Sequence, residues 1–113
     1  MRRILVIILV FLLCIISISY SLTYQIKTIV VSVNTTATKL PTTPLIGREY
    51  IQAQNIGNVT VYIGSSTVTA DTNTTGGTQL LPYATWYGEY DNSVDVYGIV
   101  TSGTCNVTVE EGK

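Results

Sequence analysis

The hydrophobic pattern divides the chain into an apolar N-terminal run and a long stretch of alternating positions. Ile4–Leu22 contains no charged residue, and Arg2 and Arg3 stand directly before it. From Tyr24 onwards, apolar and polar residues alternate with a period of two, which is typical of β-strands. No later stretch shows a helical period. We therefore predict an N-terminal hydrophobic helix followed by an all-β domain.

The apolar run itself has two interpretations. Ile4–Leu22 is close to the roughly 20 residues that a membrane-spanning helix needs, which favours a retained signal anchor. The basic start, the apolar middle and the small residues Ser19 and Ser21 also fit a cleaved signal peptide. In both cases the arginines stay on the cytoplasmic side and the rest of the chain lies outside.

Residues 24–33 are predicted to form the first strand, with largely apolar side chains on both faces. Such a strand suits a position that is covered on two sides or that pairs with a neighbouring subunit. Asn34–Pro44 is rich in Thr and Pro and has no period, so we expect a linker or an extended arm. This divides the chain into a hydrophobic segment 1–22, a first strand with its arm 23–47, and a β-sandwich domain 48–113.

Two hairpins are predicted within that domain. One joins Arg48–Gln54 to Val59–Gly64 through an Asn/Gly turn, and the other joins Val94–Val100 to Thr104–Glu110 around Ser102-Gly103. Further strands are expected at Thr78–Leu81 and Thr85–Tyr90. The total is about seven to eight short antiparallel strands, which indicates a small β-sandwich or barrel. Because a domain this small is marginally stable alone, contacts between subunits are a natural source of stability.

Composition and charge narrow the possible partners. Only 12% of the residues are charged and 46% are hydrophobic, which excludes a disordered chain. Beyond the apolar run there are four basic and seven acidic residues, a balance of 4 − 7 = −3. An acidic outer domain is repelled by phosphate backbones, so we expect no nucleic-acid partner.

The sequence offers little for catalysis, since it contains no histidine. That removes the commonest general base and the commonest transition-metal ligand. Glu89, Asp91 and Asp95 cluster with Asn92 near one turn, and we interpret them as a solvated hairpin tip, with a calcium site or an acid–base pair as weaker alternatives. We therefore predict no enzyme, no cofactor, no metal site and no small-molecule substrate.

The two cysteines lie far apart in the chain and on opposite sides of the expected membrane boundary. We predict no disulfide between Cys14 and Cys105. Since Cys105 shares a strand face with Val107 and Val109, we expect it to be a buried small hydrophobic residue.

Four Asn-x-Thr sequons are possible glycan acceptors in a host that glycosylates exported chains. Chance matches are also expected, because Asn and Thr are abundant in this chain. The candidate acceptors are Asn34, Asn58, Asn73 and Asn106.

The densest group of aromatic residues is Trp86, Tyr87 and Tyr90, with Tyr83 just before it. Alternation places Tyr87 on the face opposite to Trp86 and Tyr90, so one face is expected to complete the core. The other is a possible subunit interface, where Tyr and Trp are enriched. A glycan-binding platform is an alternative use.

One stretch, Ala37–Glu111, carries a series of motifs in a particular order. A Leu-Pro segment is followed by a strand led by Arg48, an Asn/Gly turn, the strand Val61-Tyr62-Ile63-Gly64, a Ser-Gly-Thr turn and a closing Val-x-Val-Glu strand. This order resembles a small all-β module of phage and other viral structural proteins. The resemblance implies a building role in a virion. The apolar N-terminus is a departure from the module and favours a virus with a lipid membrane.

Together these features predict a non-enzymatic viral structural protein that is membrane-anchored or exported and acts through subunit assembly. Its partners would be further copies, other virion or surface proteins, and a bilayer that Ile4–Leu22 enters. We expect it in a virion or host membrane with the β-domain outside. A subunit of a cellular surface filament, pilin-like or using donor-strand insertion of Tyr24–Val33, is the first alternative. A membrane-tethered glycan-binding module is the second. The alternative location is secreted or at the cell surface.

Overall fold

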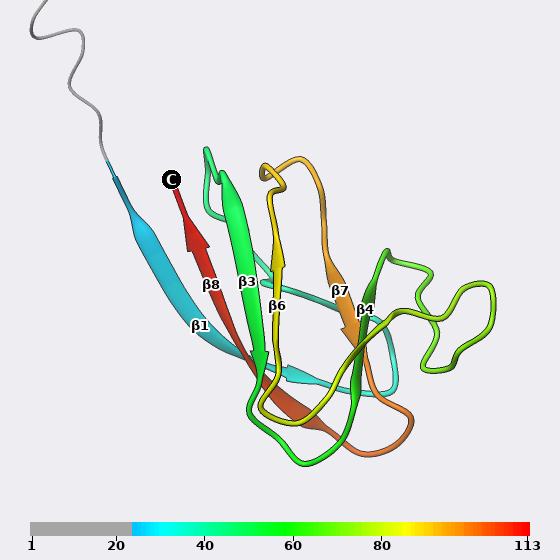
Figure 1. The fold of residues 1–113 in the computed structure, drawn as a ribbon. Helices are drawn as coiled ribbons and strands as arrows, with labels where there is room; N and C mark the ends of the chain where they lie inside the picture. The colour runs from blue at the N-terminus through cyan, green and yellow to red at the C-terminus, as the bar shows by residue number, and fades with distance from the viewer. Residues whose placement is uncertain (1–23) are drawn as a thin grey trace, which may run out of the picture.

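The computed structural model describes residues 24–113, which fold into two four-stranded antiparallel sheets (Figure 1). In spatial order, sheet A contains β1 (Ile26–Val33), β8 (Cys105–Gly112), β3 (Tyr50–Asn55) and β6 (Thr85–Gly88). Sheet B contains β2 (Thr38–Lys39), β7 (Tyr97–Ile99), β4 (Val61–Gly64) and β5 (Thr78–Leu80). The described residues contain no helix, so the all-β, sandwich-like prediction is confirmed for this part. The hydrophobic helix expected over Ile4–Leu22 lies outside the described residues.

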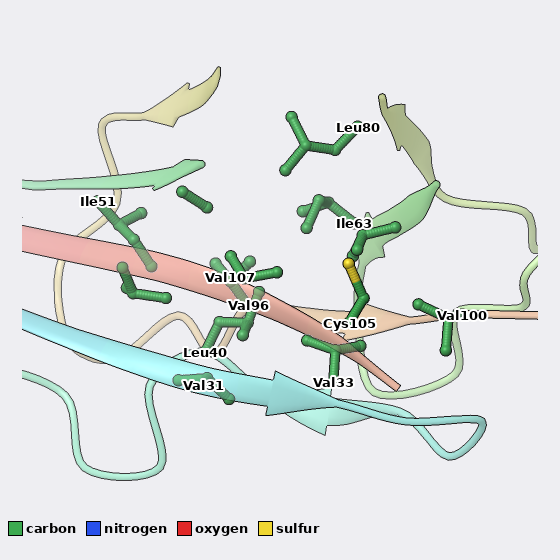
Figure 2. Packing of buried hydrophobic residues seen from close by; sticks show 13 residues of the cluster. Val31, Val33, Leu40, Ile51, Ile63, Leu80, Val96, Val100, Cys105 and Val107 are labelled. Carbon is green, nitrogen blue, oxygen red and sulfur yellow. The ribbon is translucent and has the colours of Figure 1, made fainter. Parts of the chain in front are cut away.

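The core lies between the two sheets and consists mainly of β-branched side chains (Figure 2). Alternation along β8 places Cys105, Val107 and Val109 inside, and each is at most 3% exposed. The prediction that Cys105 is a buried small side chain is therefore confirmed. Both sheets and their connections contribute to the rest of the cluster: Val31, Val33, Leu40, Ile51, Ala53, Val61, Ile63, Leu80, Val96 and Val100.

The two expected hairpins do not form, and this part of the prediction is wrong. β3 pairs with β8 and β6, whereas β4 pairs with β5 and β7, so the Asn/Gly turn crosses from one sheet to the other. The fully buried Asn55 holds this corner, because its Nδ2 donates to Val59 O at 2.7 Å and to Leu80 O at 2.9 Å. Its Oδ1 also accepts the Gly57 N–H at 2.9 Å. The connection from β7 to β8 crosses between the sheets in the same way.

The interpretation of Asn34–Pro44 as a linker or arm is also wrong. This segment supplies β2, which pairs with β7, and its backbone continues that contact where Leu40 N donates to Val96 O at 2.7 Å. Leu40 is 1% exposed and belongs to the core cluster. Thr and Pro are therefore compatible here with a short edge strand that closes one side of the sandwich. β1, placed before the sandwich domain in the prediction, pairs along its full length with β8.

The burial of Leu40 gives a direct test of this correction. Leu40→Ala should lower the free energy of unfolding by about 2–5 kcal/mol, because it removes a fully buried side chain and leaves a cavity. Ile46→Ala, in the same part of the chain but 79% exposed, should change it by less than about 0.5 kcal/mol. Denaturant unfolding of both variants measures the difference. Equal stabilities would restore the linker interpretation.

Candidate functional site

A buried ion pair lies at one end of the sandwich. Arg48 and Glu111 have side chains that are 0% and 1% exposed, and Nη1 of Arg48 lies 2.8 Å from Oε2 of Glu111. Both oxygens of the Glu111 carboxylate also accept the Leu45 N–H, each at 3.2 Å from Leu45 N. A buried charge is tolerated only when it is paired and hydrogen-bonded, and both requirements are met here.

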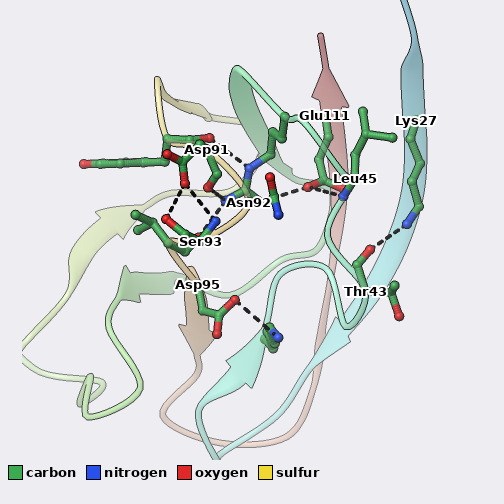
Figure 3. A network of polar contacts seen from close by, with 12 residues as sticks. Lys27, Thr43, Leu45, Asp91, Asn92, Ser93, Asp95 and Glu111 are labelled. Carbon is green, nitrogen blue, oxygen red and sulfur yellow. Dashed lines mark hydrogen bonds and ion pairs between the residues drawn. The ribbon is translucent and has the colours of Figure 1, made fainter.

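Arg48 also holds the loop that follows β6. Its Nε donates to Tyr90 O at 2.9 Å, and its Nη2 donates to Asp91 O at 2.7 Å and to Val94 O at 2.6 Å. Figure 3 shows Glu111 and the loop of Asp91–Ser93 gathered in one polar network. The pair therefore fastens a loop to the end of β8, which makes it a structural group. Sequence reasoning missed it, although Glu111 follows Val107 and Val109 on the inward face and a charge there requires a partner.

The acids predicted to lie near one turn serve separate purposes. Asp91 accepts hydrogen bonds from the side chain and backbone N–H of Ser93, and these lower the pKa of the Asp91 carboxyl below its usual value. The Oδ1 of Asn92 accepts the Gly47 N–H at 3.1 Å. Asp95 forms a part-exposed ion pair with Lys39 at 3.3 Å. Across residues 24–113, no three His, Cys, Asp or Glu side chains come together as metal ligands would.

The aromatic residues of β6 lie on opposite faces of sheet A, as the alternation predicted. Trp86 packs partly buried against the core and stacks on Tyr90, with ring centroids 6.2 Å apart and an interplanar angle of 16°. Tyr87 is 54% exposed on the outer face and stacks on Tyr50 at 5.8 Å and 24°. The Tyr50 hydroxyl donates to Glu110 at 3.0 Å, which raises the pKa of that phenol.

A cleft of about 330 Å³ opens beside β6, between the two sheets. Trp86 and Tyr90 line it from sheet A and its following loop, whereas Ile63 and Thr78 line it from sheet B. Further lining residues are Gly64, Ser65, Val94, Asp95 and Val96. The cleft therefore presents mainly apolar surface at the β6 side of the sandwich.

Within residues 24–113, no strand pairs with the outer edge of β1 in sheet A. Gln25 and Lys113 exchange backbone hydrogen bonds at 3.1 and 3.0 Å. The backbone N–H and C=O groups of the odd-numbered residues of β1 therefore point towards β8. The N–H and C=O groups of Ile26, Thr28 and Val30 point away from the sheet, and no described residue pairs with them. The strand is eight residues long and contains no proline, and its one charged side chain, Lys27, donates to Thr43 O at 2.6 Å.

The outer edge of β6, on the opposite side of sheet A, likewise has no neighbouring strand among the described residues. Asn55 N donates to Ala84 O at 3.1 Å, so the backbone groups of Trp86 and Gly88, two and four residues further on, also point towards β3. The backbone groups of Thr85 and Tyr87 therefore point outward. Within residues 24–113, no backbone partner reaches them. Large exposed hydrophobic side chains gather in or beside the two edge strands: Tyr24, Ile26, Ile29 and Val30 on one side, and Leu81, Tyr83, Tyr87 and Tyr90 on the other.

The sequon asparagines Asn34, Asn58, Asn73 and Asn106 are all exposed. Three of them lie at one end of the sandwich: Asn34 O accepts the Val100 N–H, Asn106 O accepts the Ile56 N–H, and Asn58 belongs to the same β3–β4 corner. Tyr24 and the C-terminus lie at the opposite end (Figure 1). The domain is therefore polarised along its strands.

Comparison of the chain with protein-family models, curated proteins and solved structures finds no match. In the part of the chain that the structure describes, no helix is long and apolar enough to span a bilayer.

The buried pair should behave as one energetic unit. Arg48→Met or Glu111→Leu alone should lower the free energy of unfolding by about 3–5 kcal/mol, because each leaves an uncompensated buried charge. The double variant should lose less than the sum of the two single losses. Lys39→Met, which breaks the exposed pair with Asp95, should cost at most about 1 kcal/mol. Additive single losses would show that the two charges act independently.

The exposed sequons predict glycans at one end of the domain. In protein isolated from its native source, mass spectrometry of peptides should find sugar on Asn34, Asn58 or Asn106. Thr108→Ala should remove the modification at Asn106 and Thr108→Ser should keep it, because the sequon requires a hydroxyl at that position. Unmodified peptides at all three positions would show that these sequons are chance matches.

Proposed function

We propose that this chain is a non-enzymatic structural subunit that assembles with further copies of itself through the edges of sheet A. The observation that carries the proposal is the open β1 edge, where unpaired backbone groups coincide with the exposed side chains of Ile26, Ile29 and Val30. An edge of this length without proline is a ready site for another strand, since each added strand satisfies backbone groups and covers apolar surface.

The polarity of the domain supports a surface location. β1 begins at the end where the chain emerges from residues 1–23, so a membrane anchor at Ile4–Leu22 would hold that end towards the bilayer. The end that carries Asn34, Asn58 and Asn106 would then face outward. A subunit of a lipid-containing virion is the setting that the resemblance of Ala37–Glu111 to viral modules favours, and a cellular surface filament would use the same edges.

The glycan-binding alternative receives less support. Its central residue, Trp86, packs against the core cluster, so a large part of the indole is already in use within the domain. The exposed Tyr87 is stacked on Tyr50. The remaining exposed aromatic surface fits contacts between subunits, where Tyr is enriched.

Blocking the edge tests the proposal. The Thr28 N–H points outward and has no partner in the described domain, so Thr28→Pro removes an edge donor and leaves the bonds to β8 intact. Full-length protein in detergent or lipid should form oligomers, and Thr28→Pro should abolish them while thermal unfolding of the domain stays within a few degrees of the parent. Thr28→Ala is the matched control and should still assemble. A parent that stays monomeric at every concentration would refute the proposal.

A further inference from the structure

We infer that copies join head to tail, with β6 of one copy paired to β1 of the next and Ile29 of the incoming strand seated in the cleft beside Trp86 and Tyr90. This inference rests on the proposed function, which requires only that sheet edges mediate assembly.

Strand direction makes this joint possible. Neighbouring strands alternate in direction across sheet A, so β6 runs opposite to β1 of the same copy. A second copy placed beside the first in the same orientation therefore brings its β1 antiparallel to the first copy's β6. All N-termini then emerge at the same end, as anchors in one bilayer require. Pairing two β1 edges antiparallel would send their N-termini in opposite directions along the strands.

The register follows from the rows of the sheet. Thr28 lies opposite Glu110, Glu110 opposite Gln52, and Gln52 opposite Tyr87, so Thr28 and Tyr87 stand at the same level on the two edges. Both have outward-pointing backbone groups, and hydrogen-bonded partners in an antiparallel ladder must carry their side chains on the same face. Tyr87 pairs with Thr28 of the next copy, and Thr85 pairs with Val30. The outer faces of the two sheets then form one continuous surface.

The cleft supplies the complementary shape. In this register Ile29 of the next copy stands opposite Trp86, on the inward-facing side of the sheet. Ile29 is 42% exposed in the single domain, and the cleft lined by Trp86, Tyr90 and Val94 is otherwise open. Its volume of about 330 Å³ leaves room for an aliphatic side chain. The only charge on the incoming strand, Lys27, is already held by Thr43 O at 2.6 Å within its own copy.

Disulfide trapping tests the register. Paired residues in an antiparallel ladder have Cα atoms about 5.5 Å apart, within the range that a disulfide spans. In a Cys14→Ser background, the double variant Thr28→Cys/Tyr87→Cys should give a ladder of dimers, trimers and longer species on oxidation. A mixture of the two single variants should give dimers only. Each single variant alone should give none, whereas dimers from Thr28→Cys alone would indicate β1–β1 pairing and overturn the inference.

A second variant tests the cleft. Ile29→Lys should raise the concentration needed for assembly at least about tenfold, because it places a charge in an apolar recess at the joint. Ile46→Lys, equally polar but at a 79% exposed residue outside both edge strands, should assemble like the parent. Unchanged assembly of Ile29→Lys would overturn the inference. If the double-cysteine variant assembles but forms no disulfide-linked ladder, the inferred register is wrong and the proposed function still stands. A parent protein that stays monomeric would refute the proposed function itself.

Discussion

The buried ion pair between Arg48 and Glu111 is the interaction on which the rest of the described structure depends. It joins the end of the central strand β8 to the segment before β3 and to the loop after β6, through one carboxylate and three backbone carbonyls. Without it, two loops at the same end would lose their common anchor. The sandwich is small and has no disulfide in its described part. This one buried polar network therefore holds a large part of the domain in its fixed arrangement.

The sequence predicted the class of fold because alternation reports which face of a strand is buried. Alternation gave the buried face of β8 correctly, since Cys105, Val107 and Val109 all point into the core. Alternation says nothing about which strand is the neighbour, and both predicted hairpins turned out to be crossings between sheets. The decisive feature at one crossing is Asn55, whose buried amide satisfies the corner's carbonyls. In the sequence, a turn such as Asn55-Ile56-Gly57 looks the same in a hairpin and in such a corner.

Alternation also made part of the candidate site predictable, because it shows which faces of a strand are apolar. The two-sided apolar character of β1 indicated a strand available to a neighbour, and in the structure it is an open edge strand. The cleft beside Trp86 was not predictable, because it is formed by residues from both sheets and a loop. The proposed seat for Ile29 in this cleft, the polarity of the domain and the two edges of sheet A all fit the same assembly. In it, copies stand side by side with their N-termini at the same end.

Hydrogen exchange of the backbone amides, compared between assembled and dispersed full-length protein, tests this picture most directly. Joining sheet edges converts outward-pointing amides into ladder bonds, which exchange slowly. We predict that the amides of Thr28, Val30, Thr85 and Tyr87 become protected on assembly, whereas those of Ile46 and Asn58 keep their rates. Fast exchange at both edges in the assembled state would contradict assembly through the edges of sheet A.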